Sequence, residues 1–253
     1  RHLNAELLGK LPAYHATILA LDSLLDRHRA ALGDWYADAK YYNRKTLGNY
    51  YHRLGAFEEA RLVFEELLAE LKQLPEPYWD EFAAVYMFLG DIHEQMGNYQ
   101  VALGLLEQSL ESARRDTATT AGFYGLLYKQ LGDVYYRSEQ PDRARQSYRR
   151  ALQLFDAPTS RGKRNRFITT CNALAELHLR LEELDSADYW LRRSLTYHTP
   201  DDPFKTETYR QLGEVYAQRG DYAEALAYLE QALSSPGAYE GKNYQTARIY
   251  RAM

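Results

Sequence analysis

The side chains that could perform chemistry in this sequence are seven histidines and one cysteine, and their spacing favours neither a metal site nor a catalytic one. No two histidines have the His-x-x-x-His spacing of a helical zinc site, and a single cysteine cannot form a Cys-x-x-Cys pair. Cys171 and His178 share one predicted helix face, so a nucleophile with a neighbouring base is an alternative there. Gly-rich phosphate loops are missing. We therefore predict that the chain is not an enzyme and has no catalytic residue, cofactor or metal.

Two of the histidines belong to a repeated pattern. A Leu followed by a small residue recurs five times, and an Ala stands thirteen residues after each Leu. If that Leu is position 7 of a unit, the small residue is position 8, the Ala is position 20, and a Tyr or His fills position 11. A bulky residue also recurs at position 24 and Leu at position 28. The pairs are Leu47-Gly48, Leu89-Gly90, Leu131-Gly132, Leu174-Ala175 and Leu212-Gly213, and the alanines are Ala60, Ala102, Ala144, Ala187 and Ala225.

Each unit must contain two helices to position this pattern. Positions 4, 7, 8 and 11 have the spacing of one helix face, and positions 20, 24, 27 and 28 repeat it. The small residues at positions 8 and 20 indicate close contact between the two helices, which explains Gly inside a helix despite its cost of roughly 1 kcal/mol relative to Ala. A turn with Gly or Pro separates the helices in four units, whereas Glu182-Glu183 replaces the Gly in the fourth.

These residues closely resemble the pattern of the tetratricopeptide repeat, from residue 41 to about residue 238. The resemblance implies an all-α fold, a right-handed α-solenoid of stacked helix-turn-helix repeats. Unit starts at 41, 83, 125, 168 and 206 give a period of about 42 residues in place of the usual 34, and we expect the extra residues to lengthen the first helices. Such long periods resemble those of kinesin light chain, a mitotic-spindle adaptor and peptide-sensing bacterial regulators. The predicted organisation is a helical cap or degenerate repeat over 1–40, five repeats over 41–82, 83–124, 125–167, 168–205 and 206–241, and a further helix over 242–253.

The two ends carry further expectations. Residues 14–29 have a helical stripe, and Pro12 is expected to interrupt any helix that runs into it. Residues 242–253 continue a helical pattern with apolar residues, which predicts a possible self-association edge, and the chain is expected to be a fragment of a larger protein.

The composition of the chain argues against some classes of partner. A chain of 253 residues with 45% hydrophobic and 26% charged residues resembles a globular protein, and its net charge of −4 argues against a nucleic-acid partner. No apolar run is long enough to cross a membrane, so no membrane partner is expected. A lone cysteine fits a reducing compartment and a cytoplasmic location.

Tetratricopeptide arrays line a concave groove with their first helices, so the resemblance implies that positions 2, 5, 9, 12 and 13 face a protein or peptide partner. Here positions 5, 9 and 13 form basic, acidic and basic stripes. Lys129, Asp133 and Arg137 are alternatively i,i+4 partners worth about 0.2–0.5 kcal/mol per pair, and the two accounts are compatible. Lys45 and Asn49 also match the first element of the family's carboxylate clamp, but Phe88, Leu126 and Gln130 replace its other elements. The candidate groove residues are Lys45, Asn49, Arg53, Met87, Asp91, Lys129, Asp133, Tyr136, Arg137, Asn172, Glu176, Arg180, Arg210 and Glu214.

Two functions follow from this interpretation. The first is a protein-interaction scaffold that holds a peptide or helical segment in the groove. The alternative is a sensor or regulatory module of a larger signalling protein, for example a bacterial one, that controls an attached catalytic or DNA-binding domain. A dense basic run, residues 161–166, is expected to be a solvated loop, and binding of an acidic partner or a phosphate is the alternative there.

Overall fold

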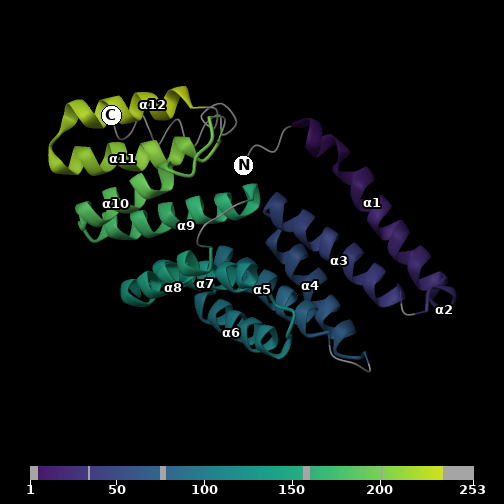
Figure 1. Ribbon diagram of the computed structural model, residues 1–253. Helices are drawn as coiled ribbons and strands as arrows, with labels where there is room; N and C mark the ends of the chain where they lie inside the picture. Colours follow the sequence, from purple (N-terminus) through teal and green to yellow (C-terminus); the bar gives the residue numbers. More distant parts are fainter. Residues whose placement is uncertain (1–4, 34, 75–77, 156–159, 201, 236–253) are drawn as a thin grey trace. The chain divides into compact units, whose positions relative to one another are not determined.

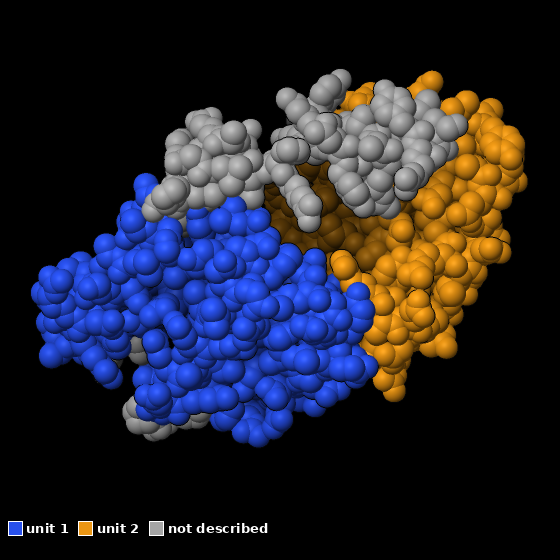
Figure 2. All heavy atoms as spheres, turned by 180° about the vertical axis from the view of Figure 1, so that it is seen from behind, with its two compact units in different colours: residues 1–119 blue, residues 120–253 orange. Residues whose placement is uncertain are grey.

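The computed structural model describes residues 5–33, 35–74, 78–155, 160–200 and 202–235 (Figure 1). These residues form twelve α-helices and no strand, which confirms the all-α prediction for the described part of the chain. The predicted helix at 242–253 and its self-association edge lie outside the described residues. The chain divides into two compact units, residues 1–119 and 120–253 (Figure 2).

Neighbouring helices pair as hairpins in both units. In unit 1, α3 pairs with α4 and α5 with α6, while α1 packs on α3 and α4 on α5. In unit 2, α7, α9 and α11 pair with α8, α10 and α12, while α8 packs on α9 and α10 on α11. Each unit is therefore a helical repeat solenoid, whereas the exact repeat boundaries stay a prediction. The helices of unit 1 are α1 (Ala5–Arg27), α2 (Arg29–Leu32), α3 (Trp35–Leu54), α4 (Phe57–Leu71), α5 (Trp79–Gln95) and α6 (Tyr99–Arg115); those of unit 2 are α7 (Ala121–Arg137), α8 (Pro141–Leu154), α9 (Arg161–Arg180), α10 (Leu184–Leu195), α11 (Lys205–Arg219) and α12 (Tyr222–Ser234).

The first helices are extended toward their N-termini. Helix α3 begins at Trp35, six residues before the predicted start of the first repeat at residue 41. Helices α5, α7 and α9 begin four to seven residues before the predicted starts of the second, third and fourth repeats. The expectation that the long period lengthens the first helices is therefore confirmed for these four. The same extension corrects the interpretation of the basic run, because residues 161–166 are the first turns of α9 and not a loop. Ser160 caps that helix by accepting a hydrogen bond from the Lys163 backbone N–H.

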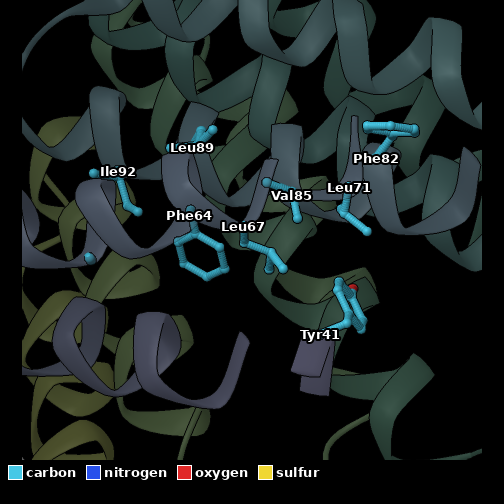
Figure 3. Close-up of a cluster of buried hydrophobic side chains, with 9 residues drawn as sticks. Tyr41, Phe64, Leu67, Leu71, Phe82, Val85, Leu89 and Ile92 are labelled. Carbon is cyan, nitrogen blue, oxygen red and sulfur yellow. The ribbon is translucent and has the colours of Figure 1, made fainter. Parts of the chain in front are cut away.

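The repeated small and bulky residues build the core. In unit 1, Phe64 and Leu67 of α4 pack against Val85, Leu89 and Ile92 of α5 (Figure 3). Each glycine at position 8 lies against the bulky side chain at position 24 of the same repeat. A Cβ atom added to that glycine would lie 2.5–2.9 Å from this side chain. The close approach predicted from the sequence is thus chiefly between the position 8 backbone and the position 24 side chain. The four such pairs are Gly48 and Phe64, Gly90 and Leu106, Gly132 and Tyr148, and Gly213 and Leu229.

The turns inside the hairpins share one backbone conformation. Position 15 of each of the five repeats has a positive φ. The angle is 75°, 81° and 85° at Gly55, Gly97 and Gly220. In the third and fourth repeats this position is Glu139, with φ of 60°, and Glu182, with φ of 57°. The turn at Glu182 is therefore built like the others although it lacks the glycine that favours left-handed backbone.

We expect Glu182→Gly to raise the free energy of unfolding by about 0.5–1 kcal/mol. The substitution removes the steric penalty of about 1–2 kcal/mol that an L-residue has at positive φ. Part of this gain in stability is lost because Gly increases the conformational entropy of the unfolded chain. Urea denaturation measures the change. The reciprocal control Gly97→Ala should lower the stability, and a decrease with Glu182→Gly would show that its side chain makes a stabilising contact.

Helix α1 differs from the sequence expectation at Pro12. The helix runs without a break from Ala5 to Arg27, so Pro12 does not end it. Proline removes one backbone hydrogen bond, and the following residues are held to α3 by packing of the buried Ile18 and by polar contacts. The Lys40 Nζ atom lies 3.0 Å from Asp22 Oδ2 and 2.7 Å from Asp26 Oδ1, which fixes α1 against α3.

Candidate protein-binding surfaces

The first helices of unit 1 hold Lys45 among aromatic rings. Its Nζ atom lies 5.2 Å from the ring centroid of Tyr41, 5.8 Å from that of Tyr42 and 5.9 Å from that of Phe88. These are cation–π distances, and the ring of Phe88 stands where the second clamp element would need an amide. Lys45 therefore has ring partners on both α3 and α5, while Asn49 remains half-buried on the same helix.

The remaining unit 1 candidates differ in accessibility. Asp91 Oδ2 on α5 lies 3.0 Å from His52 Nε2 on α3, so the two first helices are also linked by an acidic and an imidazole side chain. Arg53 is exposed, whereas Met87 is buried. Tyr42, a tyrosine that falls off the repeated core stripe, is 64% exposed and adds a ring to this face.

In unit 2, Lys129 and Asp133 form the i,i+4 pair that the sequence allowed. The Lys129 Nζ atom lies 2.6 Å from Asp133 Oδ2, and the Tyr148 hydroxyl of α8 donates a 2.9 Å hydrogen bond to Asp133 Oδ1. Both carboxylate oxygens of Asp133 are thus engaged within the hairpin. The hydrogen bond from Tyr148 to Asp133 joins α8 to α7, and the Lys129–Asp133 pair is thereby less free for a partner.

Tyr136 and Arg180 meet across two first helices. The Arg180 guanidinium of α9 lies 4.8 Å from the ring centroid of Tyr136 on α7. Arg180 and Arg137 are exposed and Tyr136 is half-buried. Aromatic and arginine side chains of this kind are the residues most often found at energetic hot spots of interfaces.

The candidates on α9 and α11 form a buried polar cluster. Arg210 is 3% exposed, and its guanidinium lies 2.7 Å from Glu207, 2.8 Å from Glu214 and 3.4 Å from Glu176. Asn172 is also buried and donates a 2.9 Å hydrogen bond from Nδ2 to the Thr208 hydroxyl. Arg210 and Asn172 therefore join α9 to α11. These two residues and Met87 are buried, so the proposed binding faces do not include them.

The arginines of α8 were not among the residues predicted to bind a partner. This helix carries Arg143, Arg145, Arg149 and Arg150 with Asp142 as its sole carboxylate, and the spacing of these residues in the sequence was the available signal. They line a cavity of about 670 Å³ between α7 and α8. The basic run at residues 161–166 is the more evident signal in the sequence because its four cations are nearly contiguous.

The alternative catalytic pair is placed in the core. Cys171 is fully buried, and burial raises the pKa of its thiol to about 12, so the thiolate that a nucleophile needs is strongly disfavoured. His178 is buried as well, its Nδ1 contacts Glu183, and burial lowers its pKa despite that carboxylate. Both residues act as packed parts of unit 2.

Among the described residues, no group of three or more His, Cys, Asp or Glu side chains is arranged to hold a metal ion. Within the same residues, every helix is too short or too polar to span a bilayer.

Two known proteins are similar to this chain in sequence. The chain is 22% identical over 196 residues to Protein KINESIN LIGHT CHAIN-RELATED 2 of Arabidopsis thaliana, which covers 76% of this chain and 29% of that protein. It is 26% identical over 291 residues to human Superkiller complex protein 3, covering 89% and 17%. The chain thus spans less than a third of the length of either relative.

Two solved structures share the fold. BtubC (BKLC) from P. vanneervenii superposes with a TM-score of 0.76 at 20% identity, covering 92% of this chain and 94% of that one. The Rap conjugation gene regulator of the plasmid pLS20, solved in complex with the Phr* peptide, gives 0.68 at 16% identity, covering 87% and 59%.

A family model described as tetratricopeptide repeat matches residues 38–115, 81–157 and 166–235. The matched segments include most of the chain, and the helix pairs, their turns and the small residue at position 8 have the pattern of that repeat. This chain belongs to the tetratricopeptide repeat family.

Proposed function

We propose that this chain is a protein-interaction scaffold whose first helices bind a peptide or a helical segment of a partner protein. Support comes from the family, whose arrays are repeat scaffolds, and from the arrangement of the first helices in each unit. In unit 2, α9 contacts both α7 and α11, so their outward sides make one surface.

The observation that carries the proposal is the contact of Tyr136 with Arg180 at 4.8 Å, because it brings two candidate residues from different repeats to one accessible place. Glu176, four residues before Arg180 on α9, is 30% exposed, and its Oε2 atom lies 3.4 Å from Arg210 Nη2 and accepts a 3.0 Å hydrogen bond from Gln211 Nε2. A bound segment could therefore place an apolar side chain on the ring, a carboxylate on Arg180 and a basic group on Glu176. We infer a ligand of mixed charge, bound in the extended or helix-in-groove mode.

A peptide library displayed on phage tests the proposal without assuming a sequence. Panning on the immobilised chain should enrich a consensus, and a synthetic peptide of that consensus should bind in fluorescence anisotropy. The double substitution Tyr136→Ala and Arg180→Glu should weaken binding at least about tenfold, which corresponds to about 1.4 kcal/mol.

Arg161→Glu provides the matched control, since it makes the same charge change at an exposed position at the other end of α9. It should leave the affinity within about twofold. Panning that enriches no consensus above bare support, or a consensus peptide that binds the double variant as tightly as the wild type, would contradict the proposal. Thermal unfolding of all proteins checks that the variants are folded.

A further inference from the structure

A second surface lies on the α7–α8 hairpin, and its lining includes neither Tyr136 nor Arg180. The cavity of about 670 Å³ has the rings of Tyr128 and Tyr135 and the side chain of Leu131 on its α7 side. Four arginines lie on its α8 side, with Asp142 as the only carboxylate in the lining. We call this surface the α7–α8 arginine groove, lined by Tyr128, Leu131, Tyr135, Arg143, Arg145, Arg149 and Arg150.

Most of the positive charge of the groove is not neutralised within the described part of the chain. Arg145 pairs with Glu183, with 2.7 Å between Nη2 and Oε1. The other three arginines form no ion pair with a described carboxylate. Arg143 reaches the Gln140 side chain at 3.1 Å and the Tyr135 ring at 5.6 Å, and Arg150 reaches Gln153 at 3.1 Å.

This arrangement contrasts with arginines that are neutralised within the described residues. The protein has a net charge of −4, and elsewhere arginines such as Arg61 and Arg210 are flanked by two or three glutamates. In the groove, Arg143, Arg149 and Arg150 are exposed beside half-buried tyrosine rings. Like charges gathered on one helix repel one another, and a bound anion removes that repulsion.

The chemistry of the lining selects the anion. Arginine forks bind carboxylates through two parallel hydrogen bonds, and tyrosine rings give apolar area for the intervening backbone and side chains. We propose that the α7–α8 arginine groove binds an acidic peptide segment, one that carries several Asp or Glu residues in an extended stretch. The groove uses Tyr128, Leu131 and Tyr135 of α7 and includes neither Tyr136 nor Arg180, so this proposal does not rest on the one above.

The test uses the full chain and a fluorescein-labelled hexapeptide of alternating Glu and Asp, followed by fluorescence anisotropy. Wild-type binding should weaken as salt is raised from about 50 to about 200 mM, because exposed charges are screened. Arg149→Glu with Arg150→Glu should weaken binding at least about tenfold. The weaker pair Arg149→Gln with Arg150→Gln should lower affinity by about three- to fivefold, and it serves if the reversed protein fails to fold.

The chain offers a matched control in its other basic cluster. Arg161→Glu with Lys163→Glu makes the same charge change on exposed residues of unit 2, at the start of α9. This control should bind the hexapeptide within about twofold of wild type. An equal loss in both double variants would overturn the proposal in favour of unspecific attraction.

Three further outcomes would also overturn it. Absence of wild-type binding at low salt and millimolar peptide would show that the groove is not a site for carboxylates. A labelled six-nucleotide oligodeoxythymidylate that binds more tightly, and is lost in the same Arg149 and Arg150 variants, would assign the groove to nucleic acid. A melting temperature that falls sharply in the glutamine variant would show that the arginines serve the chain's own folding.

Discussion

Replacement of Arg210 by methionine is expected to lower the free energy of unfolding by about 2–4 kcal/mol. Removing one partner of a buried charge cluster leaves the remaining charges without compensation, at a cost of about 3–5 kcal/mol when they are fully buried. The carboxylates of Glu176, Glu207 and Glu214 are 30%, 22% and 36% exposed, so water reduces this cost here. Methionine keeps most of the side-chain volume, which separates the charge effect from a cavity.

The cluster itself explains why Arg210 is stably buried. Burial alone would lower the pKa of its guanidinium, but hydrogen bonds and charge interactions with Glu207, Glu214 and Glu176 outweigh burial and raise it. The same three glutamates would repel one another in the variant. Differential scanning calorimetry and urea denaturation measure the loss.

Arg219→Met is the matched control for charge removal. Arg219 Nη2 lies 2.6 Å from Asp185 Oδ1, but the Asp185 side chain is fully exposed, and such surface pairs contribute about 0–1 kcal/mol. We expect a change within about 0.5 kcal/mol. Equal losses for Arg210→Met and Arg219→Met would contradict the assignment of a buried cluster between α9 and α11.

Two glycine substitutions should change stability in opposite directions. Gly132→Ala is expected to destabilise the chain by about 1–3 kcal/mol, because the new Cβ would lie 2.5 Å from Tyr148 ring atoms. That ring is 1% exposed, and its hydroxyl is held by Asp133, so it has little freedom to move. Gly104→Ala in α6 meets no atom within 4 Å and should stabilise by about 0.5–1 kcal/mol, the usual gain of Ala over Gly in a helix.

Urea denaturation of the two variants measures the difference. Both substitutions add one methyl group inside a helix, so helix propensity alone would give them the same sign. A stabilising Gly132→Ala would show that α7 and α8 can separate or that the Tyr148 ring can turn away.

The sequence by itself determined the family, the number of helices per repeat and the place of the close contacts. The regular recurrence of Leu47-Gly48 and its four counterparts sufficed, because helix periodicity and side-chain volume are local properties that each unit repeats. The long period also predicted the extended first helices. The left-handed turn at Glu182 was not predictable in the same way, because the backbone there follows from the hairpin packing around it and not from the residue type.

Only the tertiary structure decided what the charged candidates do. Lys45 and Arg210 share position 5, yet one lies beside aromatic rings and the other is buried among three glutamates. A helical pattern gives the direction of a side chain on its own helix, but the neighbouring helix supplies the partner, and that helix differs from repeat to repeat. The arginines of α8 gained significance for the same reason, since the cavity they line needs both helices of the hairpin to be in place.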